Sequence, residues 1–118
     1  MKEKVVFEYY DKDEFRVFWR KLPHKEAVKL LVTIEKISKF GLLIAQEQQW
    51  IKKLESNLFE IRSHYGNNSA RAIYFHKEGN HYIITHGFKK KSNKIPMREI
   101  THAKAIRTKF LKDDSNEK

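Results

Sequence analysis

The stretch LFEIRSHYGNNSARAIYFHKEGNHYIITHGF, residues 58–88, contains three runs of β-branched and aromatic residues separated by two turn signals. Such runs favour strands, and short turns rich in Gly and Asn favour antiparallel hairpins between them. The runs are residues 58–65, 70–76 and 81–88, and the turns are residues 66–69 and 78–80. We therefore predict an antiparallel three-stranded meander at the centre of the fold.

The segment before the meander begins with a strand and a helix. Residues 4–10 (KVVFEYY) are β-branched and aromatic, which favours a first strand. Asp11 followed by Glu14 resembles a capping box, so we expect a helix to begin there. Pro23 ends or restarts that helix, because proline cannot continue the hydrogen-bond pattern of a helix interior.

Two more helices complete the expected order of elements. An apolar stripe over residues 27–37 predicts a second helix with Gly41 as its C-cap. Residues 42–49 are expected to be a connection with at most a short helical turn. Pro96 suits the first turn of a final helix. The order is therefore β-α-α-β-β-β-α, an α+β fold in which helices cover a small, mostly antiparallel sheet.

The length and the charge of the chain limit its organisation and its partners. With 118 residues, the chain suits a single domain, which we place at residues 1–112, followed by a polar tail at residues 113–118. The formal net charge is +10, and between His86 and Lys112 the only acidic residue is Glu99. In a chain this basic, the first partner to expect is a nucleic acid.

The composition also excludes several classes of site. The absence of cysteine excludes disulfides, thiol nucleophiles and cysteine–zinc sites. No apolar run is long enough for a transmembrane helix, and the start MKEKVVFEYYDKDEF becomes acidic too early for a signal peptide. The six histidines include no HxxxH pair. We therefore expect a cytoplasmic protein with no membrane partner, no metal and no cofactor.

Three ordered blocks carry a resemblance to a known family. They are LESNLFEIR at residues 54–62, RAIYF at 71–75 and HGFKKKSNKIPMREITHAKAI at 86–106. Together they resemble the RelE/ParE toxin superfamily, specifically the phage-derived HigB-like branch of bacterial type II toxin–antitoxin systems. The resemblance covers about residues 50–112. It departs from the family at Asn57, which stands where glycine is usual and which tolerates left-handed backbone geometry.

The resemblance implies a toxin with a RelE-like fold that acts as a metal-independent mRNA endoribonuclease. In that reaction the 2′-hydroxyl attacks the adjacent phosphate and a cyclic phosphate is produced. The resemblance also implies a cognate helix-turn-helix antitoxin, a heterotetramer with it, and RNA, including ribosome-bound mRNA, as substrate. Two alternatives stay open: a ParE-type toxin that inhibits gyrase, and a nucleic-acid-binding protein that does not cleave.

The positions that match the family motifs supply the candidate catalytic residues. The resemblance places Arg62 and Arg71 on successive strands and Lys90 in the basic pair after the last strand. A guanidinium can hold two phosphate oxygens, so both arginines are predicted to clamp phosphate, and Lys90 to support the transition state. The structural alternative is an ordinary salt bridge, for instance between Arg62 and Glu60. Glu60 is either a general base or a group that orients Arg62.

Further candidates come from the strand histidines and the basic segment. His86 and His64 have an intrinsic pKa near 6.5, which suits proton transfer, and we select His86 as a catalytic candidate. The candidate RNA-binding residues are Phe88, Lys89, Lys91 and Lys94. Phe88 either stacks on an unpaired base or is buried in the core beneath the basic segment. Trp50 is expected to be a core residue.

Overall fold

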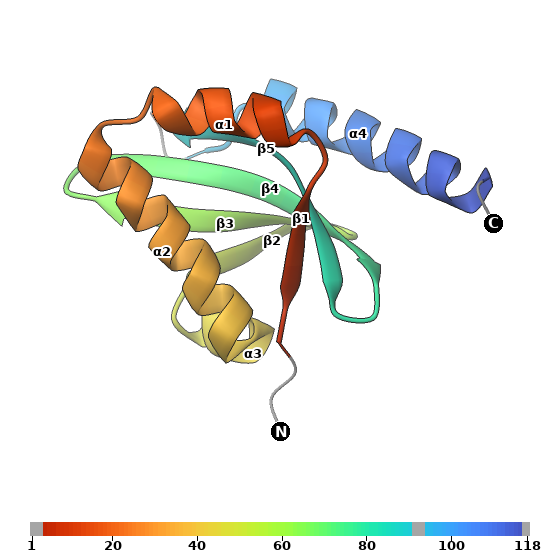
Figure 1. Ribbon diagram of the computed structural model, residues 1–118, viewed down its shortest axis with the longest axis horizontal. Helices are drawn as coiled ribbons and strands as arrows, with labels where there is room; N and C mark the ends of the chain where they lie inside the picture. The colour runs from red at the N-terminus through yellow and green to blue at the C-terminus, as the bar shows by residue number, and fades with distance from the viewer. Residues whose placement is uncertain (1–3, 91–93, 117–118) are drawn as a thin grey trace.

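The structure, a computed structural model, describes residues 4–90 and 94–116 (Figure 1). Its elements, in chain order, are β1 (Val6–Tyr9), α1 (Lys12–Arg20), α2 (His24–Phe40), α3 (Leu42–Glu47), β2 (Ile51–Glu55), β3 (Leu58–Tyr65), β4 (Asn68–Glu78), β5 (His81–Lys90) and α4 (Met97–Asn116). The predicted α+β class is confirmed, and the predicted order of elements holds with α3 and β2 added to it.

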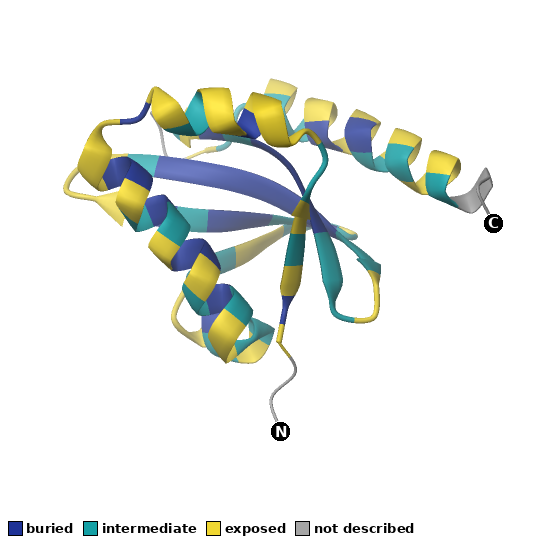
Figure 2. Ribbon diagram, viewed as in Figure 1, coloured by how far each residue is buried: buried dark blue, intermediate teal, exposed yellow. Residues whose placement is uncertain are grey.

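The strands form one sheet in the order β1-β5-β4-β3-β2. The predicted meander is confirmed, because β3 pairs antiparallel with β4 and β4 pairs antiparallel with β5. β1 joins the far side of the meander in parallel to β5, and β2 pairs antiparallel with β3 at the opposite edge. β4 therefore lies at the centre of the sheet, where most of its residues are buried (Figure 2).

Helices cover the two faces of this sheet. α1, α2 and α3 pack on one face, where α1 and α2 lie in front of the strands in Figure 1. The core on that face includes Phe15, Leu30, Ile37, Ala45, Ile61, Ala72, Tyr74 and Ile84. α4 packs on the other face through Ala103 and Ile106, which contact two smaller apolar clusters. No helix in the described residues is long and apolar enough to cross a membrane.

The predicted ends of the first two helices have a local physical cause. Asp11 Oδ1 accepts a hydrogen bond of 3.0 Å from the Glu14 backbone N–H at the start of α1. An aspartate in this position stabilises a helix by about 1 kcal/mol. Gly41, with a φ of 89°, ends α2, and its N–H donates to the Ile37 carbonyl at 2.9 Å. The left-handed φ explains why glycine is suited to this position.

Asn57 adopts the left-handed backbone geometry that asparagine tolerates. The φ of Asn57 is 48°, at the turn between β2 and β3. Its side chain exchanges two hydrogen bonds with the backbone of His76, which fixes the turn against β4. Arg107 of α4 donates to the carbonyls of Ser56 and Asn57 at 2.8 Å and 3.0 Å. These bonds tie α4 to the far end of the sheet.

The structure differs from the sequence prediction in three segments. Residues 42–47 form the six-residue helix α3 rather than a mere connection with a short turn. Ile51–Glu55, which carried no strand prediction, forms the edge strand β2, whose apolar and polar residues do not alternate strictly. α4 continues through Asp113 to Asn116, into the segment expected to be a polar tail. Short edge elements are often decided by their neighbours in the fold rather than by local preference.

Candidate functional site

The register of the sheet brings the predicted site residues onto one face. Arg62 of β3 lies directly opposite Arg71 of β4, and Arg71 lies opposite Phe88 of β5. Side chains directly opposite each other in an antiparallel pair, and side chains two residues apart on a strand, share a face. Glu60 and His86 therefore lie on this face too, which is the face that α4 partly covers.

Glu60 lies between the two arginines. Its Oε1 is 3.8 Å from Arg62 Nε, and its Oε2 is 3.5 Å from Arg71 Nε. The side chains of Glu60 and Arg71 are 1% and 2% exposed, whereas the side chain of Arg62 is 25% exposed. The contact between Arg62 and Glu60 that the sequence offered as a structural alternative is thus present, and Arg62 is the arginine that reaches solvent.

Arg71 is a buried cation held mainly by carbonyl oxygens. Its Nη1 donates to the carbonyls of Ser63 and Ala70 at 3.4 Å and 3.3 Å. Burial lowers the pKa of Arg71, Glu60 acts to raise it, and the charge of Arg62 lowers it further. This order of causes means that desolvation outweighs the attraction to Glu60.

Three buried polar atoms of this group have no hydrogen-bond partner among the described residues. They are Glu60 Oε2, Arg62 Nε and Arg71 Nε. The two ion pairs are longer than the 2.7–2.9 Å of a charge-assisted hydrogen bond, so they do not satisfy these atoms. The Nε–H groups of both arginines therefore keep an unused capacity to donate a hydrogen bond inside the protein.

Two lysines extend this group of charges. Burial lowers the pKa of Lys90, the charges of Arg71, Arg62 and Lys52 lower it further, and Glu60 opposes the shift. Lys52 lies opposite Glu60 across β2 and β3, so its exposed side chain leaves the sheet on the same face. Sequence reasoning missed Lys52 because no strand was expected there.

His64 belongs to the same group of charges. It lies opposite Ser69, its Nδ1 is 2.9 Å from Ser69 Oγ, and Ser69 in turn lies opposite Lys90. Burial and then the charges of Arg71, Arg62, Lys90 and Lys29 lower the pKa of His64. His64 is exposed, so it is a titratable group with access to solvent. We call Lys52, Glu60, Arg62, His64, Arg71 and Lys90 the arginine cluster.

His86 lies on the same face but is engaged with α4. Its Nε2 is 3.0 Å from Glu99 Oε1, its Nδ1 is 3.0 Å from Thr85 Oγ1, and its ring lies 4.6 Å from that of His102. Burial lowers the pKa of His86, and the hydrogen bond to Glu99 acts to raise it. In the register, Ile73 lies between His86 and Glu60. The structure therefore places His86 apart from the arginine cluster.

The remaining predicted residues lie at several different places. Phe88 is 7% exposed and packs with Leu58, Ile73 and Ala103, so the structure shows the buried alternative for this ring. Lys89 lies opposite Ala70, on the face that α2 covers, and its Nζ is 3.5 Å from Glu26 Oε1. Lys94 is exposed, and Lys91 lies outside the described residues.

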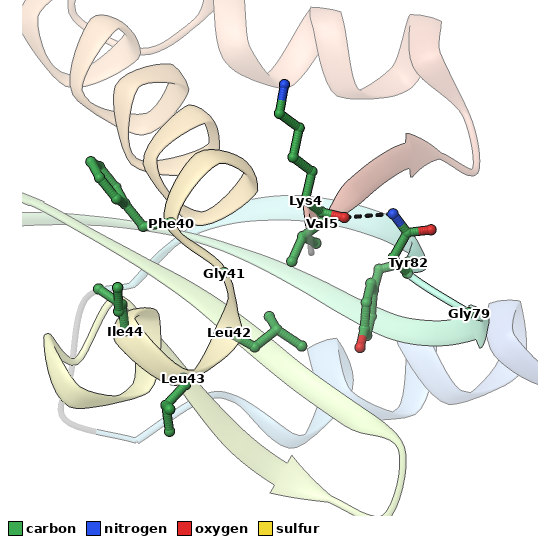
Figure 3. Close-up of a pocket in the computed structure, with 10 residues that line it drawn as sticks. Lys4, Val5, Phe40, Gly41, Leu42, Leu43, Ile44, Gly79 and Tyr82 are labelled. Carbon is green, nitrogen blue, oxygen red and sulfur yellow. Dashed lines mark hydrogen bonds between the residues drawn. The ribbon is translucent and has the colours of Figure 1, made fainter. Parts of the chain in front are cut away.

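The described residues include no group of three or more His, Asp or Glu side chains that could hold a metal ion. One hollow has a volume of about 360 Å³, and none of its lining residues belongs to the arginine cluster. Figure 3 shows this hollow with its lining residues. Leu42 and Tyr82 border it, and Asn80 Nδ2 donates a hydrogen bond of 2.6 Å to the Lys4 carbonyl at its rim. Its lining is mainly apolar and contains none of the predicted site residues, so the candidate chemistry is concentrated at the arginine cluster.

Comparison with known proteins gives one family. The family model described as phage derived protein Gp49-like (DUF891) matches residues 17–108 of the chain. The matched segment runs from within α1 to within α4 and contains every described residue of the arginine cluster. No curated protein matches the chain.

Proposed function

Because the chain belongs to the family of phage-derived Gp49-like proteins, we propose that it is the toxin of a type II toxin–antitoxin system that cleaves RNA without a metal ion. The motifs at residues 54–62, 71–75 and 86–106 further favour its HigB-like branch. The observation that carries the proposal is the arginine cluster, in which Arg62 and Arg71 contact the buried carboxylate of Glu60 and two lysines lie on the same face. Like charges gathered on one side of a protein favour a polyanionic ligand.

The reaction needs a general base, a stabiliser of charge and a general acid. The base takes the proton of the 2′-hydroxyl while the 2′-oxygen forms a bond to phosphorus. The bond from phosphorus to the 5′-oxygen then breaks, the acid protonates that oxygen, and the products are a 2′,3′-cyclic phosphate and a 5′-hydroxyl. The phosphorane between these steps is dianionic, so fixed cations beside it lower the barrier.

We assign the stabilising role to the arginines. Arg62 reaches solvent with part of its guanidinium, which suits a direct contact with the non-bridging phosphate oxygens. Arg71 lies behind it and is buried, so its charge acts from beneath the phosphate unless the guanidinium moves outward. Glu60 contacts both guanidinium groups, which supports the orienting alternative for this residue over the general base.

His64 and Lys90 are suited to the proton transfers. A lowered pKa leaves more of His64 neutral at pH 7, and a neutral imidazole can accept the 2′-hydroxyl proton. Burial and the neighbouring arginines lower the pKa of Lys90, which makes its ammonium group a better acid for the leaving oxygen. His64 replaces His86 in this assignment because both ring nitrogens of His86 already have partners.

The test is RNA cleavage by the purified chain in the presence of a metal chelator. We expect cleavage with 2′,3′-cyclic phosphate ends, identified by mass spectrometry, and a rate that falls about a hundredfold in Arg62→Ala. Arg20→Ala is the matched control, because Arg20 is exposed on α1, which packs on the opposite face. Intact RNA that still binds would favour the non-cleaving alternative. Stabilised gyrase-cleaved plasmid would favour the ParE-type alternative.

The proposal includes a partner that silences the toxin. A protein with a net charge of +10 attracts RNA over long distances, so a cell that makes it needs a protein that blocks the arginine cluster or holds it out of reach. We propose a helix-turn-helix antitoxin encoded beside this chain. Expression of the chain alone should arrest growth, and co-expression of the neighbouring reading frame should restore it. Normal growth at high levels of the intact chain would contradict the toxin assignment.

A further inference from the structure

The outer edge of β3 becomes free beside the arginine cluster. β2 pairs with β3 only from Leu58 to Ile61, and the next backbone contact is the 2.7 Å bond from Arg62 N to the Trp50 carbonyl. Beyond Arg62, the described part of the chain places no strand along this edge of β3. α2 passes the same edge on the other face of the sheet, so the edge has a helix on one side and the cluster on the other.

A hollow of about 290 Å³ lies at this free edge. α2 contributes Lys29, Thr33 and Lys36 to its wall, β3 contributes Arg62 and His64, and Trp50 closes it between them. We call this hollow the edge pocket. Arg62 belongs both to the edge pocket and to the arginine cluster, so the two sites are continuous.

The charges of the edge pocket have one sign. Each ionisable side chain in its described lining is basic, and none is an acid. The pKa of His64 is lowered by burial and by Lys29 of the pocket as well as by the arginines of the cluster. An anion that binds among these side chains is therefore attracted by several positive charges at once.

The pocket also has a polarisable side wall. Lys36 Nζ lies 5.3 Å from the centre of the Trp50 ring, and the indole is only partly buried. A cation over an aromatic face holds the lysine side chain in place, so less freedom is lost when an anion binds it. The fluorescence of Trp50 therefore reports on what enters the pocket.

We propose that the edge pocket binds the phosphate of a single-stranded polynucleotide next to the phosphate that Arg62 holds in the arginine cluster. This inference rests on the proposed function, because it takes the ligand of the cluster to be RNA. Lys29 and Lys36 neutralise the second phosphate, and Arg62 lies between the two phosphates. A hollow of this size accommodates about one nucleotide and is concave, which suits a flexible single strand better than the regular surface of a duplex.

The experiment measures binding with the nucleophile of the reaction removed. The probe is a fluorescein-labelled 2′-O-methyl oligouridine of four nucleotides, which cannot be cleaved by 2′-oxygen attack. Its affinity for the full chain is measured by anisotropy from low to moderate salt. The test variant is Lys29→Ala/Lys36→Ala, and the matched control is Lys25→Ala/Lys39→Ala, which removes the same charge from exposed positions of α2 outside the pocket.

We expect the test variant to bind roughly tenfold more weakly at low salt, with a slope of log affinity against log salt that is shallower by about 0.7, because one phosphate fewer is neutralised. The control should lose much less. Binding should change Trp50 fluorescence in the parent, and Trp50→Phe should abolish that change while Trp19 still emits. Thermal melts establish that each variant is folded. An equal loss of affinity in the test and control variants, or a Trp50 signal that does not respond, would overturn the edge pocket.

The same samples separate this inference from the proposed function. Unmodified oligouridine of the same length is incubated with the parent and with both variants. Binding that depends on Lys29 and Lys36, together with uncut RNA in the parent, would support the pocket and overturn the nuclease. Cleavage by the parent, together with equal binding of the probe by the test and control variants, would support the nuclease and overturn the pocket.

Discussion

At the scale of single residues, Arg62 and Arg71 lie opposite each other across β3 and β4 but differ in their access to solvent. Both contact the same carboxylate, Glu60, and neither contact is short enough for a strong hydrogen bond. Arg62 can therefore exchange Glu60 for a phosphate at little cost. Arg71 cannot, because leaving Glu60 buried without it is expensive.

This difference predicts separate effects of the two substitutions. Arg62→Ala should leave the free energy of unfolding within about 1 kcal/mol of the parent and slow single-turnover cleavage about a hundredfold. Arg71→Ala should lower the free energy of unfolding by about 3 kcal/mol, because Glu60 then loses a buried partner. Arg71→Lys should recover only part of that loss, since lysine lacks the planar fork. Urea unfolding and single-turnover kinetics at saturating enzyme measure both effects. Equal stability of the two alanine variants would contradict the distinct roles.

The shifted pKa values predict a bell-shaped dependence of the cleavage rate on pH. His64 must be neutral to act as a base, and its pKa is lowered from 6.5, so the rate should fall on the acidic side only below about pH 6.5. Lys90 must be protonated to act as an acid, and its pKa is lowered from 10.5, so the rate should fall on the basic side before pH 10.5. His64→Gln should remove the acidic limb and Lys90→Ala the basic limb, each with a loss of about a hundredfold at pH 7. An unchanged profile in either variant would remove that residue from the mechanism.

At the scale of elements, the site depends on how closely α1 approaches β5. Gly87 lies beneath α1, and a Cβ at this position would lie 2.6 Å from Phe18 Cδ2 and 3.2 Å from Phe15 Cε2. A Cβ essentially never lies as close to another atom as 2.6 Å, so the Phe18 ring or the elements that carry these residues would have to shift. Gly87 immediately precedes Phe88, which lies beside Arg71 in the register, so this contact helps to fix β5 against the arginine cluster.

Gly87→Ala should therefore destabilise the fold by about 1–3 kcal/mol through overpacking. Phe18→Leu in the same chain shortens the opposing side chain, so the double variant should cost less than the sum of the single variants. Urea unfolding of the two single variants and the double variant measures this coupling. Strictly additive effects would show that Gly87 and Phe18 do not press on each other.

The elements also show which features the sequence could predict. The strands of the meander and the caps at Asp11 and Gly41 follow from local preferences, and the structure confirms them. The joint placement of Glu60, Arg62 and Arg71 on one face followed from alternation along the strands and from the family motifs. The roles assigned to these residues stay predictions.

Other features depend on contacts between distant segments, which no local pattern contains. β2 is a short strand at the edge of the sheet, so its residues gave no signal, and Lys52 was missed with it. The burial of Arg71 depends on carbonyls of β3 and β4 that converge only after pairing. Trp50, expected in the core, packs against it but is only partly buried, and it also borders the edge pocket.

At the scale of the whole molecule, positive charge is spread well beyond the arginine cluster. The net charge is +10, and α4 carries several exposed lysines on a helix whose C-terminal half extends past the sheet in Figure 1. Such charges raise the rate at which a polyanion arrives, and they act over about a Debye length, about 10 Å at 0.1 M salt. They do not contact the reacting phosphate, so they should leave the chemical step unchanged.

Reversing the charges of lysines far from the arginine cluster should therefore slow the association of RNA without slowing its cleavage. Lys109→Glu/Lys112→Glu lowers the net charge by four units, because each reversal changes it by two, and both residues are exposed on α4. We expect its association rate with a labelled RNA to fall several-fold at low salt and to approach that of the parent as salt rises, since added ions screen the lost attraction. Its single-turnover cleavage rate at saturating enzyme should match that of the parent.

Arg62→Ala should show the reverse behaviour. Its association rate should be close to that of the parent, because only one unit of charge is lost, and its cleavage should be slow. Stopped-flow fluorescence and quenched-flow cleavage measure the two steps on the same RNA. If the α4 reversal slowed the chemical step as much as Arg62→Ala does, the reacting phosphate would lie near α4, and the arginine cluster would be a docking surface for the rest of the strand.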